Sequence, residues 1–218
     1  MKVDKFRTVI IYIIIILLGL VCLLPLLNIV AISFSSSAAV EGNMVGLIPV
    51  GFSTAAYEKI LEDSQFWHSF LISVERVVLT LIINFVLIVL MAYPLSKTNA
   101  QFRGRNVYAN LMIFAMLFNG GMIPTFLLVK SYGLLNTVWA LVLPGAVPIF
   151  NVILVMNFFA AVPKELEEAA FIDGANPLQV LTKIFIPISK PVLATVSLFS
   201  IVGSWNDFYS GLIYMSKA

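Results

Sequence analysis

The sequence predicts an all-α integral membrane protein, built as a polytopic bundle of helices. Of its 218 residues, 61% are hydrophobic and 11% are charged, and the mean hydropathy is +1.02. A typical soluble domain is nearer half apolar and a quarter charged. A water-soluble fold of this length lacks the polar surface to cover so much apolar material, so membrane lipid is the natural surrounding. The net charge of +2 gives no indication of a nucleic-acid partner.

Five apolar runs are each close to the length that crosses a bilayer. The first follows residues 1–8 and is too long for the apolar part of a signal peptide, so we interpret it as a retained signal-anchor. The expected spans are residues 9–32, 77–96, 107–129, 138–160 and 188–209.

The distribution of basic residues predicts that the N-terminus is cytoplasmic. In that orientation nine of the 13 basic residues lie inside, namely Lys2, Lys5, Arg7, Lys97, Arg103, Arg105, Lys164, Lys183 and Lys190. The other four lie outside, namely Lys59, Arg76, Lys130 and Lys217. Residues 33–76 then form a polar outer loop, with a short helix expected over residues 54–62. Arg76 is expected beside Glu75, as an anchor at the outer end of a helix.

Glycine and proline interrupt the third and fourth spans. The third contains Asn119-Gly120-Gly121-Met122-Ile123-Pro124, and the fourth contains Pro144-Gly145 and Pro148. Membranes tolerate such breaks where neighbouring protein satisfies the freed backbone groups, or where the break lines a cavity. The sequence is equally consistent with simple kinks and with a cavity-lining wall.

The loop at residues 161–187, predicted to be cytoplasmic, encodes two short helices joined by a glycine turn. Pro163 suits a first helical turn, and Gly174 predicts a left-handed stop. Asn176 and Pro177 predict the cap and first turn of the second helix. The first helix is too short to span a bilayer or to be stable alone in water. Its pattern alone slightly favours a linker helix on the membrane surface.

The same loop resembles the EAA loop of ABC importer permeases. Glu168-Ala169-Ala170, then Gly174, then Ile184 and Pro187 follow the spacing of that motif, with Ile186 where leucine is usual. Asn119–Pro124, Gly133–Thr137 and Trp205-Asn206-Asp207 resemble segments of carbohydrate-type permeases. The subgroup that the chain resembles takes up polysaccharide fragments and is related to the smaller permease subunit of maltose transport.

The resemblance implies a bundle of the ABC type I importer kind over residues 9–218. Such permeases usually have six spans, so a chain with five is expected to be incomplete at its C-terminus. ATP would bind a separate ATPase dimer, leaving this chain without a cofactor or metal. Further implied partners are a second permease in a heterodimer, a solute-binding protein outside the membrane, and a carbohydrate substrate. The implied ATPase-coupling residues are Glu168, Ala169, Ala170, Asp173, Gly174, Ile184 and Pro187.

Polar residues within the spans are candidates for the substrate pathway. Amide and carboxylate groups bind sugars and aromatic rings stack on them, which singles out Asn119, Trp205, Asn206 and Asp207. Hydrogen bonding between helices is the alternative role, favoured for Ser204.

Motifs of enzymes are missing from the sequence. It contains no P-loop, no HExxH and no GxSxG, and Cys22 and His68 are single residues of their kinds, so no catalytic residue is assigned. Two other functions stay open. A secondary, ion-coupled transporter would normally show internal repeats, and a non-transporting scaffold would not need broken spans.

Overall fold

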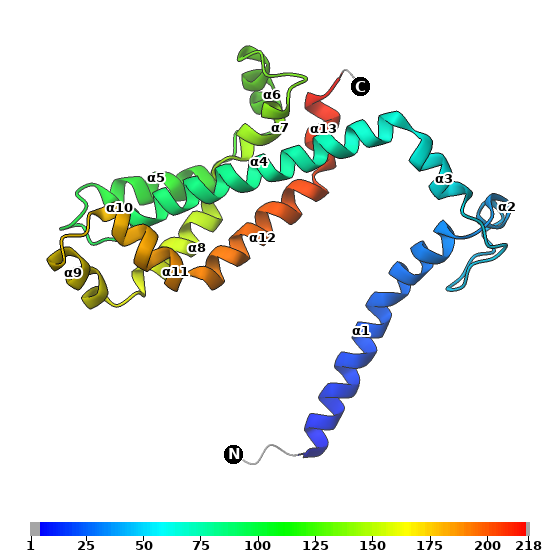
Figure 1. The fold of residues 1–218 in the computed structure, drawn as a ribbon, viewed down its shortest axis with the longest axis horizontal. Coiled ribbons are helices and arrows are strands. Elements are labelled where there is room, and N and C mark those ends of the chain that lie inside the picture. The colour runs from blue at the N-terminus through cyan, green and yellow to red at the C-terminus, as the bar shows by residue number, and fades with distance from the viewer. Residues whose placement is uncertain (1–4, 217–218) are drawn as a thin grey trace. The chain divides into compact units, whose positions relative to one another are not determined.

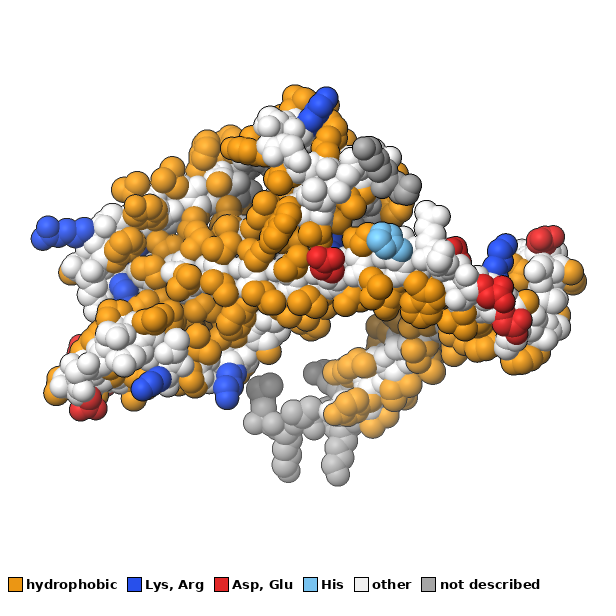
Figure 2. All heavy atoms as spheres, turned by 45° about the horizontal axis from the view of Figure 1, so that its top comes forward, with side chains coloured by type: hydrophobic (Ala, Val, Ile, Leu, Met, Phe, Trp, Pro, Cys, Tyr) orange, Lys and Arg blue, Asp and Glu red, His pale blue; other side chains and the backbone are white. Residues whose placement is uncertain are grey.

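The computed structural model describes residues 5–216, and in that range every regular element is a helix. The all-α fold class predicted from composition is therefore confirmed. The chain divides into two compact units, Met1–Phe70 and Leu71–Ala218, which are described separately (Figure 1). Hydrophobic side chains cover much of the visible surface (Figure 2), as expected of helices that contact lipid.

The first unit begins with the helix predicted as the first span. Helix α1 (Lys5–Ser33) contains an apolar stretch of 26 residues, Thr8–Ser33. No residue in the most apolar part of this stretch is buried. At 1.5 Å per residue this stretch is about 39 Å long. That exceeds the hydrocarbon core of a bilayer, which is about 30 Å thick. This helix is therefore long enough to cross a membrane.

The segment after α1 is an ordered loop with two short helices, α2 (Ser37–Glu41) and α3 (Ala55–Glu62). The helix α3 confirms the short helix predicted over residues 54–62. Ser53 N–H donates to the Phe34 carbonyl oxygen at 3.0 Å, and the Phe34 ring stacks on Phe52 with centroids 5.7 Å apart. The loop is thus fixed against the end of α1 by its own contacts.

The second span differs from its prediction at its start. Helix α4 (Ser64–Leu95) is 32 residues long and begins well before Val77. Polar residues between Ser64 and Arg76 lower the hydropathy without breaking a helix, and the Asp63 carboxylate accepts from Gln65 N–H at 2.9 Å at the start. Hydropathy marks the length suited to hydrocarbon, whereas the helix extends further.

The glycine- and proline-rich interruptions are confirmed as sharp bends. Helices α5 (Arg105–Leu117) and α6 (Met122–Ser131) meet at 111°, with Gly121 between them at φ +86°. Helix α7 (Val138–Val142) and the 3₁₀ turn η1 (Leu143–Gly145) meet α8 (Ile149–Ala160) at 48°. A positive φ is readily adopted only by glycine, which explains the position of the first bend.

The last predicted span is shorter than expected at its end. Helix α12 (Lys190–Asn206) stops before Asp207, whose carboxylate accepts from Ser210 N–H at 3.1 Å and caps α13 (Phe208–Tyr214). Helix α12 is also bent by 84° from the helical segment Pro177–Ile188. Within residues 5–216, two helices are individually long and apolar enough to span, and there are up to five candidate spans when each bent pair is taken as one span.

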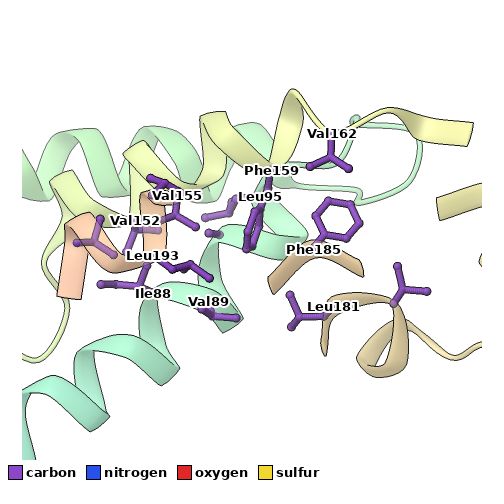
Figure 3. Close-up of a cluster of buried hydrophobic side chains, with 14 of the residues drawn as sticks. Ile88, Val89, Leu95, Val152, Val155, Phe159, Val162, Leu181, Phe185 and Leu193 are labelled. Atoms are coloured by element: carbon purple, nitrogen blue, oxygen red, sulfur yellow. The ribbon is translucent and has the colours of Figure 1, made fainter. Parts of the chain in front are cut away.

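The main hydrophobic core of the second unit joins α4, α8 and α12 to the loop after α9. Its buried members include Ile88 of α4, Val155 and Phe159 of α8, and Leu193 of α12 (Figure 3). Phe185 packs edge-on against Phe159, with centroids 5.4 Å apart. The second arm of the predicted coupling loop is therefore part of the core.

Candidate functional site

The first arm of the loop is helix α9 (Lys164–Ile172), which begins directly after Pro163. Gly174 has φ +81°, and Ala175 N–H donates to the Ala170 carbonyl oxygen at 2.9 Å, so the predicted left-handed stop is confirmed. A Cβ at Gly174 would meet no atom within 4 Å. The backbone conformation, and not lack of space, requires glycine here.

The second arm begins with α10 (Pro177–Val180), capped as predicted. Asn176 Oδ1 accepts from Gln179 N–H, and Asn176 N–H donates to Gln179 Oε1, both at 2.9 Å. This reciprocal arrangement is a capping box. The chain continues through a π-helical turn, η2 (Leu181–Phe185), into α11 (Ile186–Ile188). Pro187 has no N–H to donate to a carbonyl oxygen of the preceding turn, and the backbone hydrogen bonding of the helix is irregular at that point.

The predicted coupling residues separate into an exposed group and an inward-packed group. Ala170 and Ile184 are partly buried against the hydrophobic core. The others are exposed, namely Glu168, Ala169, Asp173, Gly174 and Pro187. Ala170 therefore packs on this chain's own core, whereas the sequence analysis placed it in a motif for contact with the ATPase.

Beside the exposed group, α9 carries apolar side chains that the sequence analysis did not single out. Ile172 is 86% exposed and Phe171 is 43% exposed. They precede the Gly174 turn, in a loop too short to span a membrane. Apolar residues at the end of such a helix are a signal that sequence reasoning had available.

Glu167 points the other way, into a cluster of charged and aromatic side chains. Lys97 Nζ lies 2.7 Å from the Glu167 carboxylate, and the two side chains are 12% and 11% exposed. The ammonium group also lies over the rings of Tyr93 and Phe185, 4.1 and 4.2 Å from their centroids. Tyr93 O–H donates to Glu167 Oε1 at 3.3 Å. We call these four residues the Lys97 cluster.

The electrostatics of the Lys97 cluster combine desolvation with pairing. Burial lowers the pKa of Lys97 below 10.5, while the hydrogen bond and the charge of Glu167 act in the opposite direction. Glu167 and Lys97 are 70 residues apart in the chain, so local sequence pattern does not indicate this pairing. Only the packing of α9 against the end of α4 brings them together.

A polar cavity of about 390 Å³ lies further along the same bundle. Its polar lining includes Arg76, Thr80 and Asn84 on α4, Asn151 on α8, Ser200 and Ser204 on α12, and Asp207 and Ser210 at the start of α13. The three α4 residues recur every four positions and so share one helix face. That spacing in an apolar run is a signal the sequence analysis missed.

Arg76 is not the outer anchor beside Glu75 that the sequence predicted. Its side chain is 10% exposed and forms an ion pair with Asp207. It also donates to the Asp207 backbone oxygen at 2.9 Å. A buried guanidinium group needs a carboxylate, and in the fold Asp207 is close enough to supply one.

Asn84 acts as a bond between helices. Its side-chain amide lies 3.2 Å from Ser200 Oγ. In the amide orientation that gives both the oxygen and the nitrogen a hydrogen-bond partner, the nitrogen donates to the Ala146 oxygen at 3.0 Å. Thr80 Oγ1 is buried and has no hydrogen-bond partner among the described residues. The cavity therefore holds both satisfied and unsatisfied polar groups.

Of the four predicted pathway residues, only Asp207 lines the polar cavity. Trp205 is 54% exposed, and the exposed Asn206 donates to the Val202 oxygen at 3.0 Å. Asn119 accepts from Gly121 N–H at 2.9 Å, which secures the bend between α5 and α6. Ser204, for which hydrogen bonding between helices is predicted, lines the cavity.

A family model described as "binding-protein-dependent transport system inner membrane component" matches residues 81–218. The chain belongs to this family of transport permeases, which confirms the resemblance noted in the sequence.

Among similar proteins, LplC of Bacillus subtilis (strain 168) is 44% identical over 200 residues, which cover 92% of this chain and 67% of that protein. The polygalacturonan/rhamnogalacturonan transport system permease protein YtcP of the same organism is 42% identical over 215 residues, 99% of this chain and 74% of that one. A bacterial ABC transporter that imports the acidic polysaccharide alginate matches with a TM-score of 0.89 and 35% identity, covering 100% of this chain and 77% of that chain. The fold is that of a type I importer permease.

Proposed function

We propose that this chain is the permease through which an ATP-driven importer passes an oligosaccharide or polysaccharide fragment. ATP binds a separate ATPase dimer, which docks on the loop at residues 161–187 from the cytoplasm. The observation that carries the proposal is α9, a nine-residue helix whose only buried residue is Glu167. Its exposed end, with Phe171 and Ile172, is an apolar surface that a partner protein would cover.

The relatives favour acidic sugars as the transported solute. One similar permease is named for polygalacturonan and rhamnogalacturonan, and the similar structure imports the acidic polysaccharide alginate. The polar cavity beside Asp207 supplies amide and hydroxyl groups suited to sugar hydroxyls. Asn119, Trp205 and Asn206 remain predictions for other parts of the pathway. A second permease and an extracytoplasmic solute-binding protein complete the importer.

Docking is tested by co-purifying candidate ATPases with the membrane-inserted chain. We expect Ile172→Ser to reduce the amount of ATPase recovered, because the substitution removes apolar surface from the contact. Ile48→Ser is the matched control, since Ile48 is 76% exposed but lies in the predicted outer loop. If wild-type protein recovers no ATPase, or if both variants behave alike, the docking assignment is wrong.

Transport is tested by uptake of labelled oligogalacturonide and alginate oligosaccharide into cells that express the whole importer. An ATP-driven importer loses uptake when ATP is depleted and keeps it when an uncoupler removes the proton gradient. Uptake that continues when ATP is depleted and stops when the uncoupler is added identifies a secondary transporter. If neither oligosaccharide is taken up while the ATPase remains bound, the acidic-sugar assignment fails and the coupling assignment stands.

A further inference from the structure

We infer that Lys97 and Glu167 are positioning residues for ATP-driven transport, whose buried ion pair transmits movement of the docking helix α9 to the membrane helix α4. The inference rests on the proposed function, because it takes α9 as the surface that the ATPase moves. It assigns the transmitting role to residues outside the exposed docking group.

The Lys97 cluster is the side-chain link between α9 and α4. Glu167 is the one buried residue of α9, and its carboxylate contacts two groups at the end of α4. Lys97 Nζ donates at 2.7 Å and Tyr93 O–H donates at 3.3 Å. A pull on α9 therefore reaches the end of α4 mainly through the short, charge-assisted hydrogen bond from Lys97.

The aromatic rings hold Lys97 in one position. Its ammonium group lies over Tyr93 and Phe185, and these rings meet edge to face with centroids 5.1 Å apart. Phe185 belongs to the π-helical turn and packs on Phe159 of the core. Lys97, in the turn after α4, thus contacts both arms of the loop and Tyr93 of α4, and the second arm carries the same movement into α8.

An ion pair suits this role better than an apolar contact. A buried pair is a weak source of stability compared with apolar packing, and the role inferred for this one is to hold α9 and α4 in one register. Sliding of α9 along α4 would separate the charges in a desolvated site, so the two elements move together.

The inference is tested by following the polar cavity while the ATPase changes state. A cysteine is introduced by Ser204→Cys in a Cys22→Ser background, and its modification by a soluble thiol reagent is timed in the assembled importer. Rates are compared without nucleotide and after trapping with ATP and vanadate. The variants are Glu167→Gln and Lys97→Met, with Lys97→Arg as the conservative change and Glu165→Gln as the matched, exposed control on α9.

We expect trapping to change the rate in the parent, Lys97→Arg and Glu165→Gln proteins. In Glu167→Gln and Lys97→Met the response shrinks about tenfold while ATPase recovery stays unchanged, because one buried charge has lost its partner. An unchanged response in both, or an equal loss of response and ATPase recovery, overturns the inference.

A second variant guards against failure to fold. Tyr93→Phe keeps the ring under Lys97 and removes only the hydroxyl group that contacts Glu167. If Glu167→Gln does not accumulate, a response reduced about twofold in Tyr93→Phe supports the inference, as expected from the loss of one weak hydrogen bond. A parental response overturns it. Failure of the parent importer to recover any ATPase refutes the proposed function instead.

Discussion

Two ion pairs involve α4 and the turn that follows it, and they differ in the group that supplies the positive charge. Arg76–Asp207 borders the polar cavity, and Lys97–Glu167 holds the loop that carries α9. At 1.5 Å per residue, Arg76 and Leu95 stand about 30 Å apart along α4, which is close to the thickness of the hydrocarbon core. The same helix therefore connects the predicted solute pathway to the predicted coupling loop.

The two pairs also differ in exposure. Arg76 and Asp207 side chains are 10% and 32% exposed, whereas Lys97 and Glu167 are 12% and 11% exposed. An arginine cannot lose its proton in a protein, but a buried lysine can. In the Arg76–Asp207 pair, the arginine is more buried than the aspartate and always keeps its charge. In the Lys97–Glu167 pair, the two side chains are buried to nearly the same extent.

The largest expected effect is removal of Asp207. Asp207→Asn leaves a permanent charge on Arg76 in a mostly buried site, and we expect a loss of about 3–5 kcal/mol in the free energy of unfolding. Arg76→Met leaves a carboxylate that water reaches and that can take up a proton, so the loss is smaller. Unfolding in detergent measures both variants. Equal losses would contradict the asymmetry.

The next effect is removal of Glu167. Glu167→Gln is expected to lower the free energy of unfolding by about 2–3 kcal/mol at neutral pH, as for a buried hydrogen bond to a charged group. Glu165→Gln is the control and should be close to neutral, because Glu165 is exposed.

The pH dependence of the stability of Glu167→Gln tests whether Lys97 is the group that titrates. Burial holds the folded-state pKa of Lys97 below its unfolded value of 10.5. Between those two values the unfolded chain binds more protons, so stability rises with pH. Glu167→Gln removes the negative charge and weakens the hydrogen bond that oppose the lowering, so its unfolding midpoint should rise with pH more steeply than that of wild type. In Lys97→Arg/Glu167→Gln the slope should vanish, and a persisting slope would assign the titration to another group.

A smaller effect is expected at the turn between the two arms. Gly174→Ala places a Cβ on a residue with φ +81°, which costs about 1–2 kcal/mol although no atom lies in its way. Gly19→Ala, at an open position in α1, is the control and should not destabilise the chain. Circular dichroism during heating compares the two. Equal stability would show that α9 reaches its position without the left-handed turn.

The smallest effect concerns one hydroxyl group. Tyr93→Phe removes the 3.3 Å hydrogen bond to Glu167 and leaves the ring in place, so the expected loss is about 0.5–1.5 kcal/mol. Tyr57→Phe, which removes an exposed 2.8 Å contact between Tyr57 of α3 and Ser33 of α1, is the comparison. If Tyr93→Phe loses no more stability than Tyr57→Phe, the Lys97 cluster does not depend on its hydroxyl group.

Much of the local structure was predictable because its causes are local. The span of α1 follows from a continuous apolar run, the bend at Gly121 from a positive φ, and the start of α10 from the side chain of Asn176. The start of α4 was predicted too late, since hydropathy does not register a helix that continues into polar surroundings. The loop motif was predicted from residue types and spacing alone.

By itself the sequence determined that this is a membrane protein, that its spans are interrupted at particular glycines and prolines, and that one loop carries the EAA spacing. Each of these depends on residues within about one helix length of each other. Only the tertiary structure decided that Arg76 faces Asp207 and that Glu167 faces Lys97, across 131 and 70 residues of chain. Which charges meet inside a bundle depends on how its helices pack, and helix packing follows from side-chain shape along the whole chain.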